Sequence, residues 1–211
     1  ERARLSIPAI KFFADGALGS SGAHLLDTYP DGSNGVVVDS PEFLRERIPE
    51  LMEIGWQVTV HAIGDAAGRS VLNAFEAATP AARARTRPRL EHAQMLAASD
   101  IERFGELGVI ASIQPIHMYS DAAWADEVLD ESQLERLFPW RSLQDRTVVC
   151  GGRDYPIEDL NPWHGISTAM SRLERKGRVF NAEQGLSVSE ALAAYTTGAA
   201  YAAFWEDHLG T

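Results

Sequence analysis

Cysteine and long apolar runs are what this 211-residue sequence has least of. Cys150 is the single cysteine, so the fold cannot depend on an internal disulfide, and a reducing, cytoplasmic compartment is expected. No stretch reaches the roughly 18 consecutive apolar residues that indicate a membrane-spanning helix. The opening stretch ERARLSIPAI also lacks the charged and then apolar regions of a signal peptide. We therefore expect a cytoplasmic protein that has no membrane partner.

Basic residues are scarce as well. The chain has 19 Lys and Arg against 30 Asp and Glu, which gives a formal net charge of -11. Such a surface repels a phosphate backbone, so no nucleic-acid partner is expected. Hydrophobic residues (45%) and charged residues (23%) have ordinary shares for a globular domain, and we expect residues 1–211 to form one domain. Because the sequence opens on Glu1 rather than Met, we expect it to belong to a longer protein.

Five short apolar runs are present, and helical patterns separate them. The runs lie at residues 9–15, 56–64, 88–94, 108–115 and 147–154. Their nearly continuous apolar character favours parallel strands that are buried on both faces. The alternation of strands with helices predicts an α/β fold, either a barrel or a doubly wound sheet. The glycine-rich stretch 14–22 lacks the G-x-G-x-x-G spacing of a dinucleotide-binding turn, which weakens the second alternative.

Helices are expected between and after these runs. Their predicted ranges are 40–55, 65–78, 99–108, 130–143, 161–173 and 187–204. Ser40 is the expected N-cap of the first helix. Ser99 with Glu102, and Ser187 with Glu190, have the spacing of capping boxes. These signals set the expected start of three helices.

Polar and ionisable side chains gather where the expected strands end. They are Lys11 and Asp15, then His61 and Asp65, then Glu91 and His92, then Gln114 and His117, and last Asp154. In an α/β barrel the carboxyl ends of the strands meet at one face, where catalytic residues lie. Imidazoles from neighbouring strands can share one divalent metal, while a carboxylate takes a proton from metal-bound water. The pattern therefore predicts a metal-dependent site at this face.

Each of these residues also has an ordinary structural interpretation. A lone histidine at a strand end is more often a hydrogen-bonded structural group than a ligand, but two at successive strand ends favour a site. Lys11 can snorkel from an edge strand, although a lysine among buried neighbours is costly enough to suggest a chemical role. Asp65 can serve only as a helix cap. His117 lies just past a strand end, and both interpretations stay open for it.

Four stretches together resemble a known family: KFFADGALGSSGA, VHAIGD, LEHAQ and GGRDYPIEDLNPW. They look like the metal-dependent amidohydrolase superfamily, specifically its YtcJ-like branch, which includes N-substituted formamide deformylases. The stretches follow the family's order over nearly the whole chain. The resemblance implies a TIM-like (β/α)8 barrel with a flanking β-sandwich. It also implies that this chain is the C-terminal part of the barrel domain, covering about strands 4 to 8 and their helices.

The resemblance also implies roles for individual residues. His61 and His92 would be metal ligands on the fifth and sixth barrel strands. Asp154 would be the catalytic aspartate of the eighth strand, which moves a proton between the attacking water and the leaving group. Lys11 occupies the fourth-strand position where several members carry a carboxylated lysine that bridges two metals. The implied cofactor is one or two divalent ions, with zinc as the expected metal.

Three further residues, Asp15, His117 and Arg153, are candidates for contact with a small-molecule substrate. Arg153 departs from the family's pattern, because relatives usually carry a small residue before the aspartate. Its guanidinium could crowd the site or pair with Asp154 and make that carboxylate a poorer proton acceptor. The first-strand His-x-His pair and the β-sandwich of the family are not in this sequence.

The expected function is hydrolysis of an amide or another non-peptide C–N bond, an amidohydrolase reaction that uses metal-activated water. This segment alone is expected to be inactive, because the metal site that the family builds is incomplete in it. The alternative is a catalytically inactive barrel fragment or degenerate homologue that serves as a binding or assembly module. Self-association into a homo-oligomer is compatible with both alternatives.

Overall fold

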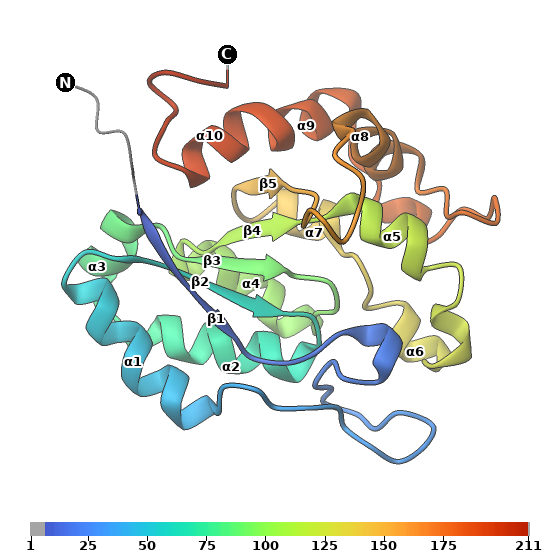
Figure 1. Cartoon of the computed structure of the whole chain (residues 1–211), viewed down its shortest axis with the longest axis horizontal. Coiled ribbons are helices and arrows are strands. Elements are labelled where there is room, and N and C mark those ends of the chain that lie inside the picture. Colours follow the sequence, from blue (N-terminus) through green and yellow to red (C-terminus); the bar gives the residue numbers. More distant parts are fainter. Residues whose placement is uncertain (1–6, 211) are drawn as a thin grey trace.

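A parallel β-sheet forms the centre of the molecule (Figure 1). The computed structural model describes residues 7–210, in which five strands are hydrogen-bonded in the order β1-β2-β3-β4-β5. Their bounds are β1 Ala9–Phe13, β2 Gln57–Ala62, β3 Arg89–His92, β4 Ile110–Ile113 and β5 Val149–Gly151. Each neighbouring pair is parallel. All five predicted strands and their parallel arrangement are therefore confirmed.

The strand order decides between the two α/β architectures. A doubly wound sheet reverses its strand order at a switch point, whereas barrel strands follow one another around the ring. Within residues 7–210 each strand pairs with the next strand of the chain, and the order is not reversed. The chain therefore forms part of a (β/α)8-type barrel.

Helices follow the strands and cover one side of the sheet (Figure 1). The helices are α1 Pro41–Glu53, α2 Asp65–Glu76, α3 Pro80–Thr86, α4 Ala98–Leu107, α5 Pro115–Asp121, α6 Glu131–Leu134, α7 Trp140–Gln144, α8 Pro162–Ser171, α9 Val188–Ala193 and α10 Ala199–Ala202. Short 3-10 turns lie at Leu18–Ser20, Ala125–Glu127 and Ala182–Gln184, and a π-helical turn lies at Ala194–Gly198. Helix α2 packs against α1 and α4, while α10 packs against β5.

Two of the three predicted helix starts are confirmed. The Oγ of Ser40 accepts the Phe43 N–H at 3.2 Å, and Ser187 with Glu190 forms a capping box at the start of α9. The predicted capping box at Ser99 is wrong. The N-cap of helix α4 is Ala97, two residues earlier than predicted, and it makes no side-chain bond, while the Glu102 carboxylate accepts bonds from Arg146 at 2.6 and 2.8 Å. A long-range ion pair thus takes the carboxylate that the local pattern assigned to the cap.

One predicted helix is broken, and another is helical as predicted but includes a π-helical turn. The range 130–143 divides into α6 and α7, because Phe138 has a φ of 54° and Pro139 follows it. The range 187–204 contains the π-helical turn between α9 and α10. The short helices α3 and α5 were not predicted. Along residues 7–210, no helix has both the length and the apolar character needed to cross a membrane.

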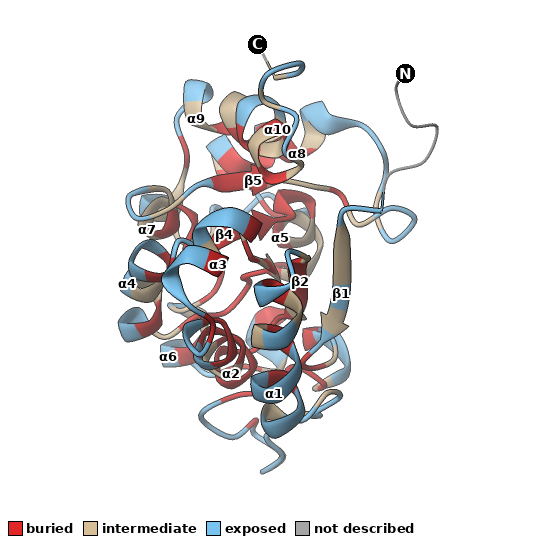
Figure 2. Cartoon of the chain, turned by 90° about the vertical axis from the view of Figure 1, so that its left-hand side faces the viewer, coloured by how far each residue is buried: buried red, intermediate tan, exposed pale blue. Residues whose placement is uncertain are grey.

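The two faces of the sheet differ in polarity. Val58, Val60 and Leu90 point to the helix side, where they are fully buried in the main core with Phe75 and Phe104. Figure 2 shows buried residues (red) running through β2, β4 and α2. Side chains alternate along a strand, so the residues between these positions point to the other face, among them Thr59, His61, Glu91 and Ser112. The polar face is the one that would line the inside of a barrel.

Candidate metal and active site

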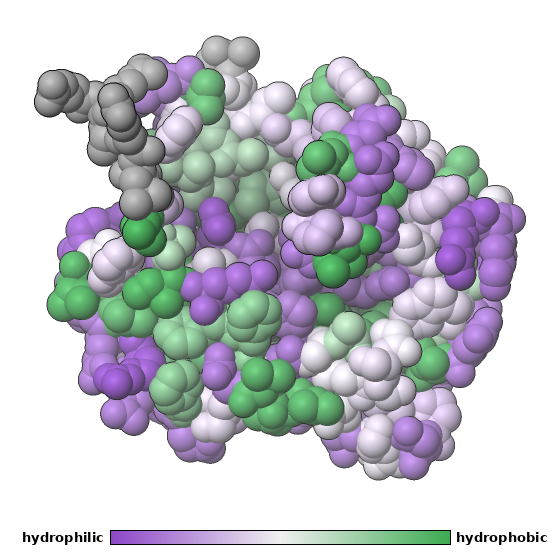
Figure 3. All heavy atoms as spheres, in the orientation of Figure 1, coloured by the Kyte–Doolittle hydropathy of each residue, from purple (hydrophilic) through white to green (hydrophobic). Residues whose placement is uncertain are grey.

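A cavity of about 720 Å³ lies at the carboxyl end of the sheet. Five residues predicted from the strand ends lie in its wall: Lys11, His61, His92, His117 and Asp154. Figure 3 shows a hollow near the centre of the drawn face, with hydrophilic side chains gathered in it. The structure therefore brings together the residues that the sequence pattern and the resemblance had selected.

His92 enters the cavity through an unusual backbone conformation. It pairs in register with Ala62, and alternation from the buried Leu90 would direct its side chain to the helix side. However, His92 has a φ of 75° and the next residue, Ala93, has a φ of 44°. Left-handed conformations are unfavourable for residues other than glycine and cluster at functional sites. This turn brings the His92 ring beside His61.

Three imidazoles lie in a row. The ring centroids of His61 and His92 are 4.4 Å apart with the rings edge to face, and those of His92 and His117 are 5.5 Å apart with the rings nearly parallel. The buried Nδ1 of His92 and Nε2 of His117 have no hydrogen-bond partner among the described residues. A buried polar atom without a partner is costly, so these nitrogens are suited to a ligand.

Burial keeps the imidazoles of His61 and His92 neutral. Desolvation, together with the neighbouring His61, His117 and Lys11, lowers the pKa of His92 to about 2. Burial also lowers the pKa of His61. A metal binds only the neutral imidazole, so both rings are in the ligand form at neutral pH.

Lys11 and Asp154 reach the same cavity from the two outer strands. Lys11 is exposed, and its Nζ lies 4.8 Å from the centroid of the Phe13 ring. Asp154 follows β5 and has a φ of 53°, a second left-handed residue in the cavity wall. A lysine and a carboxylate thus flank the histidine row. Carboxylation of Lys11 stays a prediction.

Asp15 and Arg153 do not line the cavity, in contrast to the expected substrate contacts. The Asp15 carboxylate lies beneath the wall, where backbone N–H groups bind it, and burial raises its pKa to about 7. The Arg153 side chain is buried on another side of the loop, where its Nη1 donates to the Asn161 carbonyl. Within residues 7–210 it makes no ion pair with Asp154, so the expected pairing is not seen.

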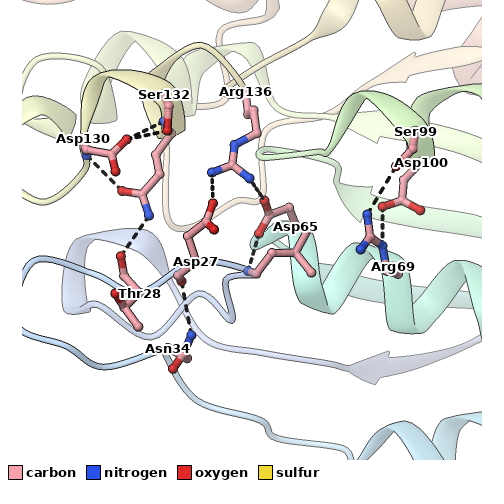
Figure 4. Close-up of polar contacts among 12 residues, drawn as sticks. Asp27, Thr28, Asn34, Asp65, Arg69, Ser99, Asp100, Asp130, Ser132 and Arg136 are labelled. Atoms are coloured by element: carbon pink, nitrogen blue, oxygen red, sulfur yellow. Dashed lines mark hydrogen bonds and ion pairs between the residues drawn. The ribbon is translucent and has the colours of Figure 1, made fainter.

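Asp65 has a structural role. Its side chain is 0% exposed, and its carboxylate accepts the Leu26 N–H at 2.9 Å and an Nη1–H of Arg136 at 2.7 Å. Arg136 also binds Asp27, so it joins the loop before α1, the start of α2 and the segment after α6 (Figure 4). We call this arrangement the Arg136 clasp. Asp65 therefore has a structural role rather than a role in the cavity, and it fulfils that role through a tertiary ion pair with Arg136.

The cavity wall contains residues that sequence reasoning missed. Asp121 lies one helical turn after His117 on α5, and its carboxylate accepts a bond from Gln94 at 2.9 Å. Burial raises the pKa of Asp121. The Ser120 hydroxyl donates to Glu158 at 2.7 Å and ties α5 to the loop after β5. The i, i+4 spacing of His117 and Asp121 would have identified this wall if α5 had been predicted.

The described residues do not form a complete metal site by themselves. No group of three or more His, Cys, Asp or Glu side chains within residues 7–210 is arranged to hold a metal ion. The two neutral imidazoles and the unpartnered ring nitrogens nevertheless fit a metal, because each offers a lone pair inside a cavity. The set is compatible with a site that needs further ligands.

Comparisons with known proteins agree with this geometry. The sequence model described as the amidohydrolase family matches residues 1–211. The chain is 38% identical over 208 residues to YtcJ of Bacillus subtilis strain 168, which is named as a candidate amidohydrolase, and covers 39% of that protein. It is 37% identical over 213 residues to LONG AFTER FAR-RED 3 of Arabidopsis thaliana, 36% of which is covered. The matches span 96% and 98% of this chain.

Two further similarities concern chemistry and fold. The chain is 28% identical over 199 residues to the N-substituted formamide deformylase of Arthrobacter pascens, of which it covers 36%. A crystal structure of an uncharacterized metal-dependent hydrolase from Pyrococcus furiosus superposes with a TM-score of 0.86 at 32% identity, over 100% of this chain and 43% of the hydrolase. The chain thus spans well under half the length of the proteins that it matches.

Proposed function

From the premise that this chain belongs to the amidohydrolase family, we propose that the full-length protein is a metal-dependent hydrolase of an amide or another non-peptide C–N bond. The observation that carries the proposal is the row of imidazoles, with unpartnered ring nitrogens, in the same cavity as Asp154. The names of the formamide deformylase and of the Pyrococcus hydrolase support the bond type and the metal.

His61 and His92 would hold the divalent metal, with Lys11 as an additional ligand if it is carboxylated. When bound, such an ion lowers the pKa of water and polarises the carbonyl of the substrate. We assign zinc as the metal, since imidazole ligands suit it. His61 and His92 are only two ligands, and catalytic zinc sites usually have three protein ligands, so the site needs at least one more, either Lys11 or a side chain outside residues 7–210.

Asp154 would move the proton. It is held at the cavity wall by the loop after β5, near enough to the histidines for its charge to act on His61. A carboxylate in this position can accept a proton from the attacking water and then donate it to the leaving nitrogen. The substrate would be a small molecule, since the cavity volume falls in the usual range for such ligands.

An inactive binding or assembly module is the second candidate. The observation that favours it is the lack of a three-residue metal group among residues 7–210. Metal analysis of the full-length protein separates the two candidates, because only the enzyme needs a bound ion. A relic site would show no stoichiometric metal.

The direct test uses the full-length protein and a panel of N-substituted amides. We expect about one or two divalent ions per chain, release of amine from at least one amide, and loss of turnover after chelation that zinc restores. Full metal occupancy without hydrolysis of any amide or related C–N compound would contradict the proposal.

A further inference from the structure

Asp15 holds the backbone on which His61 lies. The Asp15 side chain is 0% exposed, and three backbone N–H groups donate to it. Ile63 donates to Oδ1 at 3.0 Å, whereas Gly64 and His24 donate to Oδ2 at 2.8 and 2.9 Å. Two of these donors follow β2 directly after His61, and the third lies in the loop before α1. One carboxylate therefore fixes two segments of the cavity wall.

The same carboxylate also faces the His61 ring. The Nε2 of His61 lies 3.4 Å from Asp15 Oδ1 and 3.4 Å from the Gly16 carbonyl oxygen. Both neighbours are acceptors, so a neutral His61 satisfies them only when Nε2 carries the proton. Its Nδ1 then keeps the lone pair, and Nδ1 makes no hydrogen bond to any of residues 7–210.

The geometry points to Asp15 as a positioning residue that holds His61 in the Nε2–H tautomer and leaves Nδ1 as the nitrogen that can bind a metal. A carboxylate that accepts from the far nitrogen of a metal-binding histidine fixes both the tautomer and the ring orientation. The tautomer follows from the two acceptors that face Nε2, the Asp15 carboxylate and the Gly16 carbonyl. Only the consequence for metal binding rests on the proposed function.

Asp15→Asn gives this assignment a directional test. Asparagine has one oxygen, and the Oδ2 position receives two N–H donors whereas the Oδ1 position receives one. The amide oxygen therefore takes the Oδ2 position, and the NH₂ group turns toward Ile63 and His61. A donor then faces His61 Nε2, which favours the proton on Nδ1. The substitution should move the tautomer equilibrium while it conserves the shape of the side chain.

Nitrogen NMR of metal-free, full-length protein with labelled histidine reads the tautomer, and His61→Gln identifies the His61 signals. The buffer should lie well above the pKa of about 7 that burial gives Asp15. We expect Nε2 of wild-type His61 to be of the protonated type, and Nδ1 to gain protonated character in Asp15→Asn. A wild-type His61 that carries its proton on Nδ1 overturns the assignment. This wild-type measurement can overturn the assignment even if Asp15→Asn fails to fold, whereas the variant separates the effect of Asp15 from that of the Gly16 carbonyl.

Zinc affinity of the same proteins provides the second readout. We expect Asp15→Asn to bind zinc about 10- to 100-fold more weakly than wild type. Loss of the group that hydrogen-bonds the far nitrogen of a metal-binding histidine usually lowers metal affinity by that factor. Asp100→Asn is the matched control, because Asp100 is equally buried but pairs with Arg69 and Arg103 outside the cavity. It should leave both the His61 tautomer and the zinc affinity unchanged.

The two readouts separate the possible failures. An unchanged tautomer and unchanged zinc affinity in Asp15→Asn overturn the positioning role. A wild-type protein with the Nε2–H tautomer that binds no zinc contradicts the proposed function, and a shifted tautomer in Asp15→Asn still supports Asp15 as a group that orients His61.

Discussion

His92 and Asp154 both adopt left-handed backbone conformations at the edge of the cavity, with φ values of 75° and 53°. Their place in the cavity wall could be predicted, because polar residues at successive strand ends face one side of a barrel. Their conformation could not be predicted. Strand periodicity alone assigns His92 to the same face of the sheet as Leu90. The left-handed conformation of His92 does not change the order of apolar residues, so the sequence pattern cannot reveal it.

At the residue scale, substitutions should separate metal binding from proton transfer in the full-length protein. His61→Ala and His92→Ala should lose most bound metal, because each removes an imidazole ligand. Asp154→Asn should retain metal and lose about 100-fold or more in turnover, because the amide cannot accept the proton. Metal analysis and kinetics on the three variants check this, with the exposed His208→Ala as control. Unchanged turnover in Asp154→Asn would refute the role of that carboxylate.

Side-chain bonds at helix starts could be predicted where both partners are local, whereas bonds to distant partners could not. Ser187 and Glu190 bond to each other across one turn, so their spacing is sufficient evidence. Glu102 has the same spacing from Ser99, but Arg146 is 44 residues away and takes its carboxylate. Asp65 likewise binds Arg136, which lies 71 residues along the chain.

The Arg136 clasp should contribute strongly to stability at the element scale. Arg136→Met leaves the fully buried Asp65 carboxylate without its charged partner, and we expect a loss of about 3 kcal/mol in the free energy of unfolding. Arg47→Met is the matched control. Arg47 forms an exposed pair with Glu50, so its loss should cost less than about 0.5 kcal/mol. Urea unfolding of both variants measures the difference, and equal effects would show that the clasp adds nothing.

The start of α9 should give a distinct acid response. Hydrogen bonds to its carboxylate lower the pKa of Glu190 from 4.5 to about 2. The largest effect comes from the Arg141 guanidinium, and smaller ones come from the Ser187 hydroxyl and backbone N–H. A carboxylate with a lowered folded-state pKa stabilises the fold above its unfolded pKa and loses that contribution as the pH falls. Wild type should therefore lose stability between pH 4.5 and about pH 2 in a component that Glu190→Gln lacks. Thermal unfolding across this window tests the difference, and parallel pH profiles would contradict it.

For the whole molecule, the strand order is the feature that the apolar runs could not determine. They predicted five parallel strands, yet both a barrel and a doubly wound sheet are compatible with that pattern. The sequential pairing settles the architecture. The resemblance had already favoured the barrel, because it uses motif identity as well as periodicity. The chain covers only about two-fifths of the Pyrococcus hydrolase. Metal binding should therefore be compared between this chain and the full-length protein.

The isolated 211-residue chain should bind zinc at least about 10-fold more weakly than the full-length protein and show no hydrolase activity. The reason is the lack of a three-ligand group among its described residues. It should also self-associate, because within residues 7–210 β1 and β5 each have one strand neighbour and an open edge invites pairing. Calorimetry with zinc and light scattering test both points. Tight zinc binding by a monodisperse monomer would show that Lys11 or His117 completes the site.

The left-handed turn at His92 links the energetics of folding to those of the cofactor. Such a conformation costs about 1–3 kcal/mol in a residue with a side chain, and the buried Nδ1 without a partner adds to that cost. A metal that binds only the folded chain stabilises it and offsets both of these costs. The metal-loaded protein should therefore melt at a higher temperature than the metal-free one. The supply of metal in its surroundings would then influence how long the protein persists as well as how fast it works.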